Sequence, residues 1–258
     1  MNSIHSHSIL SRSAAAVLDY TVLSVGKPAT MVDFFKTWIK LPMVYSAGRA
    51  HDAIPNASFA ELFPEFDGKP ITVPGESLSR HGWNVKLHEE IYLAAAVRAL
   101  NPNRIFEIGT FNGQTTLQLA TAAPEDAVIY TIDLPEDRFD ATQGPEAFNG
   151  ARVGEKYRDS AVAHKVRQLR ADTTTFDFAP YHGKIDFLFV DAAHDYPHGL
   201  IDSQNALKMV KPGGAVVWHD FEPYWSGLVQ AICEVTAGRS LRRLAGTSMA
   251  VLRAPSGN

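Results

Sequence analysis

The chain has 258 residues, of which 45% are hydrophobic and 20% are charged. This composition is typical of a globular protein with a full-sized core, and it excludes disorder, collagen and coiled coil. Acidic residues number 28 and Lys plus Arg number 24, which gives a net charge of −4. Such a chain lacks the broad basic surface that neutralises a phosphate backbone, so we expect no nucleic-acid partner.

The apolar runs of the sequence are short. None approaches the roughly 20 uninterrupted apolar residues that a membrane span needs, and Asp19 interrupts the run in which a signal peptide would have its core. The single cysteine, Cys233, cannot form an internal disulfide and lies among apolar residues, as a small buried side chain in a reducing compartment would. We therefore expect a cytoplasmic protein without membrane contact.

The first third of the chain differs from the rest in its pattern. Residues 14–23 and 31–39 have helical spacing of apolar residues, and Pro28 and Pro42 bound the second segment. Residues 64–79 hold three prolines and two glycines, a composition typical of a linker or lid. We expect a helical cap with its linker over residues 1–80, and a second domain over residues 81–258.

Strand and helix patterns alternate after the linker, which predicts an α/β fold with a doubly wound, mostly parallel sheet. Pro212 with two glycines predicts a turn before the strand at 215–218, and Gly246 with Thr247 predicts the turn of an antiparallel C-terminal hairpin. The expected helices cover residues 87–100, 114–122, 151–164, 197–210 and 225–237. Seven strands are expected, at residues 105–108, 127–132, 166–169, 185–190, 215–218, 241–244 and 249–252.

The sharpest local motif is the turn from Glu107 to Gly113, which joins a strand to a helix. Its glycines allow the backbone to approach a ligand closely, and the helix N-terminus offers free N–H groups. The dinucleotide fingerprint would require glycine where Phe111 and Gln114 stand, so an NAD or FAD site is disfavoured. A purely structural turn remains the alternative.

An acidic residue, Asp133, ends the next strand, where it is suited to bind both ribose hydroxyls of an adenosine. Glu107 adds a negative charge beside the glycine turn. A cationic or zwitterionic nucleoside therefore fits the turn better than a pyrophosphate does.

At these residues the chain resembles the class I S-adenosylmethionine-dependent methyltransferases, from about Glu89 to the C-terminus. Glu107-Ile-Gly109-x-x-x-Gly113 is similar to the family's first motif, Asp133 to its ribose-binding acid, and Lys211-Pro-Gly-Gly to the turn before its fifth strand. The resemblance implies a Rossmann-like sheet and S-adenosylmethionine as cofactor. The cofactor-binding residues that it implies are Glu107, Gly109, Thr110, Phe111, Gly113, Thr115, Asp133, Asp172, Thr173 and Asp191. For Asp172 a helix cap is an equal alternative.

Polar side chains follow the fourth and fifth parallel strands, where ligands bind in open α/β sheets. Asp191 and His194 follow one strand, and His219 and Asp220 follow the next. Two aspartates on adjacent strand ends are suited to hold a divalent cation, and a histidine is suited to take a proton from a hydroxyl. One aspartate of this region, Asp195 in particular, has the alternative role of capping the following helix.

These segments are similar to catechol-type O-methyltransferases, and especially to the branch with macrolide-sugar O-methyltransferases and cephalosporin-hydroxylase-like proteins. That similarity implies Asp191 and Asp220 as ligands of Mg²⁺, although Phe221 replaces the third ligand, an asparagine. His194 stands where the catechol-type enzymes have a catalytic lysine. The expected catalytic residues are His194, Asp191 and His219.

The signature of methyltransferases that act on amino groups is missing after the fourth strand, where Asp191-Ala-Ala-His194 stands instead. We therefore expect an S-adenosylmethionine-dependent O-methyltransferase that acts on a small natural product such as a sugar or phenol. A tailoring oxygenase or hydroxylase on the same fold, and a nucleoside-binding module without catalysis, are the alternatives. The expected partners are the hydroxylated acceptor and a second copy of the chain in a homodimer.

Overall fold

The computed structural model describes residues 28–79, 82–135, 138 and 152–256. The chain divides into two compact units, Met1–Ser46 and Ala47–Asn258. Helix α2 (Pro28–Ala53) begins in the first unit and ends in the second. The helix predicted at 31–39 is thus part of a longer one, and Pro42 lies inside it rather than at its end. The helix predicted at 14–23 lies outside the described residues.

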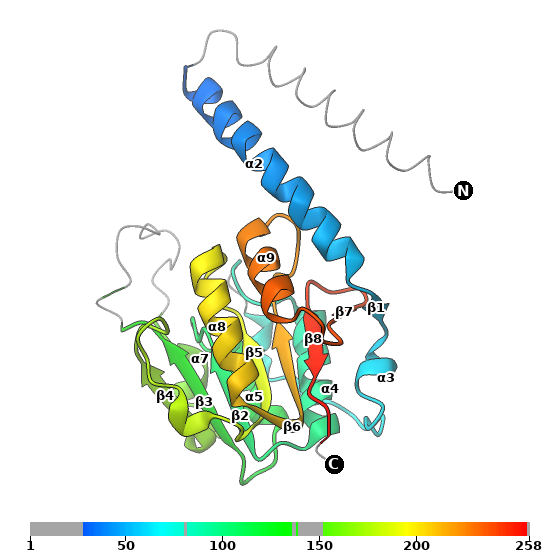
Figure 1. Ribbon diagram of the computed structural model, residues 1–258. Coiled ribbons are helices and arrows are strands. Elements are labelled where there is room, and N and C mark those ends of the chain that lie inside the picture. The colour runs from blue at the N-terminus through cyan, green and yellow to red at the C-terminus, as the bar shows by residue number, and fades with distance from the viewer. Residues whose placement is uncertain (1–27, 80–81, 136–137, 139–151, 257–258) are drawn as a thin grey trace. The chain divides into compact units, whose positions relative to one another are not determined.

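The second unit contains a mixed sheet of eight strands in the order β1-β7-β8-β6-β5-β2-β3-β4 (Figure 1). The run from β6 to β4 is parallel, and β8 is antiparallel to both β6 and β7. The strands are β1 (Asn56–Ala57), β2 (Arg104–Ile108), β3 (Val128–Asp133), β4 (Val166–Arg170), β5 (Ile185–Val190), β6 (Val210–Trp218), β7 (Arg242–Leu244) and β8 (Ala250–Arg253). The predicted fold class is confirmed, and β1, which pairs in parallel with β7, is one strand more than predicted.

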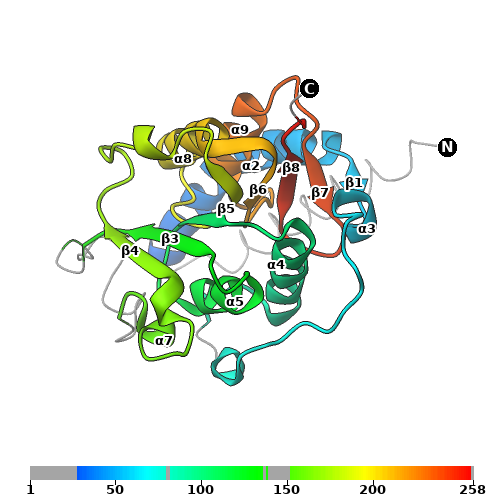
Figure 2. The same cartoon turned by 90° about the horizontal axis from the view of Figure 1, so that it is seen from below.

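Helices cover both faces of this sheet (Figure 2). On one face lie α4 (Leu87–Leu100), α5 (Gln114–Ala122) and the short α7 (Glu155–Arg158), and on the other lie α8 (Tyr196–Met209) and α9 (Ser226–Val235). Every residue of β5 is buried, and its side chains alternate between the faces: Phe187 and Phe189 pack toward α4 and α5, Leu188 and Val190 toward α8 and α9. A central parallel strand covered on both sides is expected to be apolar throughout.

Two predicted elements differ from the structure. The helix expected at 151–164 is reduced to the four residues of α7, because Gly154 adopts a φ of +74° just before it, and a 3₁₀ turn at Ala163–Lys165 follows. The turn expected at Lys211-Pro-Gly-Gly is part of β6, which starts at Val210. The strand accommodates it by a register shift against β5 and a φ of +76° at Gly213.

The segment between the first helix and residue 80 contributes to the second unit. It carries β1, helix α3 (Phe59–Leu62) and a 3₁₀ turn at Gly75–Leu78. Ser58 caps α3, because its side chain accepts from the Glu61 N–H while Glu61 accepts from the Ser58 N–H. The predicted domain boundary at residue 80 stays a prediction.

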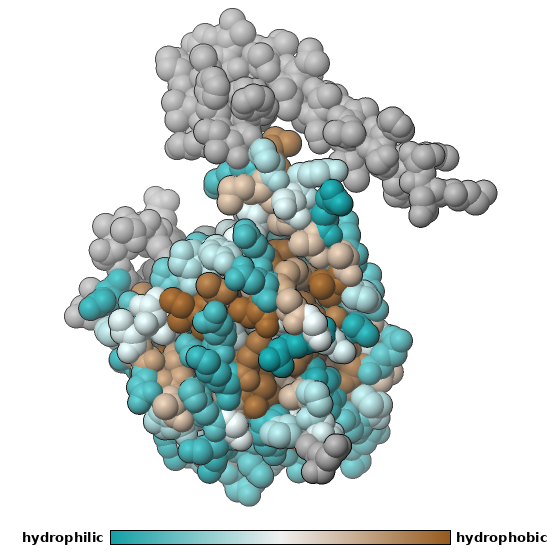
Figure 3. All heavy atoms as spheres, in the orientation of Figure 1, coloured by the Kyte–Doolittle hydropathy of each residue, from teal (hydrophilic) through white to brown (hydrophobic). Residues whose placement is uncertain are grey.

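The surface of the second unit in Figure 3 is largely hydrophilic, with apolar residues visible between the polar ones. Within the described residues, no helix has the length and apolar character needed to cross a membrane.

Candidate functional site

The carboxyl ends of four neighbouring strands, β6, β5, β2 and β3, are held in line by backbone hydrogen bonds that continue beyond the strands. Gly109 N donates to Ile132 O at 2.9 Å, Asp191 N to Ile108 O at 2.8 Å, and His219 N to Val190 O at 3.0 Å. The direction in which the chain adds strands to the sheet reverses between β2 and β5. The chain runs from β2 outward through β3 to β4, and then returns to form β5 on the other side of β2. This switch point is where open α/β sheets bind ligands.

The glycine turn is fixed by backbone geometry. Gly109 has a φ of +97°, and a Cβ atom there would lie 1.8 Å from the backbone oxygen of Asp191. The close approach that this glycine permits is therefore to the segment after β5. Phe111 adopts a φ of +47° without being glycine. The Asp133 carboxylate supports the turn, because Oδ2 accepts from the N–H groups of Thr110 at 2.9 Å and Phe111 at 2.7 Å.

Behind the turn lies a buried chain of hydrogen bonds that ends at Glu107. Gln168 donates to Thr110 Oγ1 at 3.0 Å, the hydroxyl groups of Thr110 and Thr131 are 2.6 Å apart, and Thr131 donates to Glu107 Oε2 at 2.6 Å. Thr116 also donates to Glu107 Oε2. Burial raises the pKa of Glu107 to about 8, more than the two hydroxyl groups lower it. The expectation of a negative charge at Glu107 is therefore wrong, because a carboxyl group with this pKa is mostly protonated near neutral pH.

The second glycine of the motif serves packing. Gly113 has a φ of +81°, and a Cβ atom there would lie 2.7 Å from the ring of Tyr157 and 2.8 Å from Gly154 Cα. Gly113 is the N-cap of the next helix, and Oδ1 of Asn112 accepts from Gln114 N, the first residue of that helix, at 3.1 Å. Gly113 thus lets α7 pack against the start of α5.

A cavity of about 480 Å³ opens at these strand ends. The predicted site residues that line it are Gly109, Thr110, Phe111, Thr115, Asp133, Asp172, Thr173, Asp191, His194 and Asp220. Three others, Glu107, Gly113 and His219, are absent from the lining: Glu107 supports the turn from behind, Gly113 faces α7, and His219 is the buried member of the cluster described below.

At one end of the cavity, Asp172 makes a local turn, and it does not cap a helix as its alternative role would require. Its Oδ1 accepts from Thr174 N at 2.9 Å and from Thr174 Oγ1 at 2.6 Å. Sequence reasoning missed Asp202 of α8, which lines the same end. Burial raises the pKa of Asp202 to about 6, although a hydrogen bond with Thr173 lowers it. The sequence signal that could have identified Asp202 is a carboxyl group on the inward face of a helix, among polar neighbours.

At the other end, Asp191, His219 and Asp220 bring ligand atoms within 4.8 Å of one another. Nδ1 of His219 lies 3.3 Å from Asp191 Oδ1 and 3.4 Å from Asp220 Oδ1. That nitrogen is buried and makes no aligned hydrogen bond in the described part of the chain. Two carboxylates and an imidazole nitrogen that faces them form a donor set that fits a divalent cation.

The other ring nitrogen of His219 is held by a residue that the sequence analysis did not select. Glu89 of α4 is fully buried, and its Oε2 lies 3.1 Å from His219 Nε2. Its Oε1 accepts from the N–H of Ser248 at 2.7 Å and from the hydroxyl at 2.9 Å. Burial would raise the pKa of Glu89, but His219 and Ser248 lower it to about 2. Burial would lower the pKa of His219, but the three carboxylates hold it well above its usual value.

The predicted base, His194, is positioned from two sides. Its ring stacks on Trp225 with centroids 4.0 Å apart and planes 19° from parallel, and Nε2 lies 2.8 Å from Asp220 Oδ2. Asp220 adopts a φ of +53°. Burial would raise the pKa of Asp220, but His194 and His219 hold it below its usual value. The structure thus brings His194, Asp191 and Asp220 together. Asp195 instead caps α8 by accepting from His198 N at 3.1 Å.

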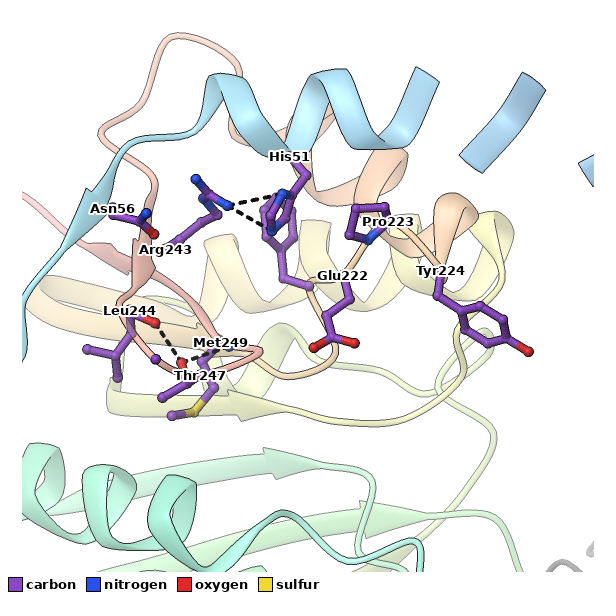
Figure 4. A pocket seen from close by; sticks show the side chains of 11 residues that line it. His51, Asn56, Glu222, Pro223, Tyr224, Arg243, Leu244, Thr247 and Met249 are labelled. Carbon is purple, nitrogen blue, oxygen red and sulfur yellow. Dashed lines mark hydrogen bonds between the residues drawn. The ribbon is translucent and has the colours of Figure 1, made fainter. Parts of the chain in front are cut away.

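A second cavity, of about 420 Å³, lies beside the loop that follows Asp220. Figure 4 shows Arg243 reaching from β7 toward the ring of His51, while Tyr224 points away from the other side chains. Nε of Arg243 donates to Ile54 O at 2.9 Å, and Nη1 lies 3.1 Å from the His51 ring nitrogens. Phe221 lines this cavity and directly follows Asp220, which lines the first.

Comparison with known proteins agrees with this arrangement. Residues 106–221 match the family described as a methyltransferase domain. The chain is 30% identical over 159 residues to caffeoyl-CoA O-methyltransferase 2 of Zea mays, a match that covers 60% of this chain and 56% of that protein. It is 29% identical over 175 residues to caffeoyl-CoA O-methyltransferase 2 of Petunia hybrida, covering 63% and 64%. The chain therefore spans less than two thirds of the length of these relatives.

Solved structures share the fold. The S-adenosylhomocysteine-bound methyltransferase PaMTH1 of Podospora anserina aligns with a TM-score of 0.53 and 17% identity, over 69% of this chain and 84% of that one. A methyltransferase of Geobacter sulfurreducens aligns with a TM-score of 0.51 and 14% identity, over 70% and 85%. The motif, the fold and the relatives agree: residues 106–221 match a methyltransferase domain, and the chain is similar to caffeoyl-CoA O-methyltransferases over less than two thirds of its length.

Proposed function

We propose that the protein transfers a methyl group from S-adenosylmethionine to a hydroxyl group of a small molecule. One observation carries this proposal. A single cavity joins the glycine turn and Asp133 to Asp191, His194 and Asp220. A nucleoside donor and a proton acceptor held side by side are the parts that methyl transfer to oxygen requires.

The donor fits the cavity in charge and in shape. Asp133 keeps acceptor capacity for ribose hydroxyls, because its two oxygens have four lone pairs and, in the described part of the chain, backbone N–H groups of three residues donate to them. Thr173 and Asp202 form the end suited to a purine with an amino group. The carboxylate of Asp191 lines the cavity beside His194 and Asp220, and its charge favours a cationic sulfonium.

The chemical step is an in-line displacement. The acceptor oxygen forms a bond to the methyl carbon as the carbon–sulfur bond breaks, which leaves S-adenosylhomocysteine. His194 takes the proton of the hydroxyl group, and the stacked ring of Trp225 keeps the imidazole in place for this. A divalent cation held by Asp191, His219 and Asp220 would lower the pKa of a hydroxyl group bound to it.

The second cavity offers a place for the part of the acceptor that is remote from the reacting hydroxyl. Arg243 and His51 give it hydrogen-bond donors, and Phe221, which lines it, directly follows Asp220 of the first cavity. The two plant relatives are named as methyltransferases of caffeoyl-CoA, so hydroxycinnamoyl esters are a suitable first class of acceptor to test. Arg243→Ala is expected to raise KM for the acceptor while the affinity for S-adenosylhomocysteine stays unchanged.

The proposal is tested in two steps. Isothermal titration with S-adenosylhomocysteine is expected to show one site, which Gly109→Ala weakens. Radiolabelled donor with a panel of catechols, hydroxycinnamoyl esters and sugars is then expected to label an acceptor at oxygen, and His194→Ala is expected to lower kcat about 100-fold or more.

Other outcomes would decide against the proposal. The proposed cofactor would be rejected if S-adenosylhomocysteine did not bind and if Gly109→Ala gave the same titration as the native chain. Oxygen consumption with iron and no methyl transfer would favour a tailoring oxygenase. Nearly full kcat in His194→Ala would reject the assigned base.

A further inference from the structure

We infer that the cluster of Asp191, His219 and Asp220 binds a divalent first-row transition-metal ion in preference to Mg²⁺, with His219 Nδ1 as a nitrogen ligand and Glu89 as the carboxylate that orients it. The inference rests on the proposed function only in using the same strand ends. It concerns the identity of the ion and the two residues, His219 and Glu89, that decide it.

The first argument is the donor chemistry. Mg²⁺ prefers oxygen ligands in near-ideal octahedral geometry, whereas imidazole nitrogen favours ions such as Co²⁺, Fe²⁺ and Zn²⁺. The residue after Asp220 is Phe221, which has no donor atom and is buried, so no side-chain oxygen from that position joins the cluster. The third donor within 4.8 Å is the ring nitrogen of His219.

The second argument is the orientation of that nitrogen. His219 is nine-tenths buried, and its Nδ1 lies between two carboxylate oxygens at 3.3 Å and 3.4 Å without an aligned hydrogen bond to either. Nδ1 thus faces the place that a cation shared by Asp191 and Asp220 would occupy. Binding of the cation there would displace the ring proton that the surrounding carboxylates favour.

The third argument is the support behind the ring. Nε2 of His219 lies 3.1 Å from Glu89 Oε2, and the hydrogen bonds from Ser248 hold the other oxygen of Glu89 in place. A carboxylate that accepts the Nε2 proton places the lone pair on Nδ1 and increases its basicity. Metal-binding histidines commonly have such a partner, so Glu89 is a positioning residue for His219.

The test is metal binding by the full chain after treatment with a chelator. Isothermal titration is expected to show Co²⁺ binding at one site at least about 100-fold more tightly than Mg²⁺. His219→Asn offers an oxygen in about the place of Nδ1, and it is expected to reduce this preference to less than about tenfold. Glu89→Gln presents an amide to Nε2 and is expected to weaken Co²⁺ binding about 10- to 100-fold, with a changed visible spectrum of the bound Co²⁺.

Controls separate this site from others. His164→Asn removes an exposed histidine that pairs with Glu125, and it is expected to leave Co²⁺ binding unchanged. On the unaltered chain, pulsed EPR of bound Mn²⁺ is expected to show ¹⁴N coupling from one imidazole, which needs no variant to fold. The melting temperature without metal shows whether each variant remains folded.

The inference is overturned if Co²⁺ binds no more tightly than Mg²⁺, if no divalent ion binds, or if bound Mn²⁺ shows no nitrogen coupling. Binding of S-adenosylhomocysteine is measured in parallel. If the chain binds this nucleoside but does not prefer Co²⁺, the proposed function stands and the inference about the metal ion is rejected. If the chain prefers Co²⁺ but does not bind the nucleoside, the inference stands and the proposed function is rejected.

Discussion

The buried carboxyl of Glu107 makes the stability of the protein depend on pH. Its pKa is about 8 in the folded chain, against 4.5 for an ordinary glutamate. Between these values the folded chain holds one proton that the unfolded chain has released. Because the folded pKa is raised, the contribution to stability is complete below pH 4.5 and is lost as the pH rises toward 8.

The magnitude follows from the difference between the two pKa values. One pKa unit corresponds to about 1.4 kcal/mol, so the difference of about 3.5 corresponds to about 5 kcal/mol over the whole range. From pH 5.5 to 7.5, Glu107 alone is expected to lower the free energy of unfolding by about 3 kcal/mol. Glu107→Gln keeps an oxygen that accepts from Thr116 and Thr131 but has no proton to lose.

The assay is urea-induced unfolding followed by circular dichroism at pH 5.5, 6.5 and 7.5. Glu107→Gln is expected to remove a slope of about 1.4 kcal/mol per pH unit from the pH dependence of the native chain. Glu125→Gln is the control, because Lys165 holds the pKa of this exposed carboxyl below its usual value and Glu125 stays ionised throughout. Equal slopes for the native chain and Glu107→Gln would refute the reasoning.

Three further outcomes are expected. Gly109→Ala brings a methyl group against the Asp191 backbone at a position with positive φ, so urea unfolding is expected to show a loss of at least about 2 kcal/mol, and an unchanged midpoint would contradict the contact. Trp225→Leu removes the ring on which His194 stacks, so steady-state kinetics is expected to show kcat lowered about tenfold at unchanged donor affinity; a change in donor affinity alone would point to another role. Burial raises the pKa of Cys233, so a thiol reagent is expected to react slowly with the folded chain and rapidly in urea, and equal rates would contradict it.

Much of the sheet could be predicted from the sequence because its signals are local. The helices at Leu87–Leu100 and Gln114–Ala122 and the strand at Ile185–Val190 have the predicted bounds, since each is set by its own apolar pattern and by flanking Pro or Gly. The strand β1 has only two residues, and its pairing with β7 joins positions almost 190 residues apart. No local pattern indicates such an edge strand.

The candidate site likewise contains residues that local sequence signals identify and residues that only the packing of distant segments reveals. Asp191, His194 and Asp220 could be selected because they directly follow strands whose ends must meet. Glu89 could not, because an acid in the first turn of a helix is already explained by the helix dipole. Its role depends on the packing of α4 against the end of β6. Glu107 was selected from its motif and expected to be charged, but complete burial, which a sequence does not report, raises its pKa to about 8.

The contact between Gly109 and the Asp191 backbone has a consequence for how such a protein can diversify. The two segments touch main chain to main chain, so the spacing between the glycine turn and the segment after β5 is set by backbone packing and not by a side chain. Side chains around the second cavity come from the end of α2, from the loop after Asp220 and from the C-terminal hairpin. Exchange of residues such as Arg243 or Tyr224 is therefore expected to reshape the second cavity while the spacing of the proposed donor turn and Asp191 stays the same.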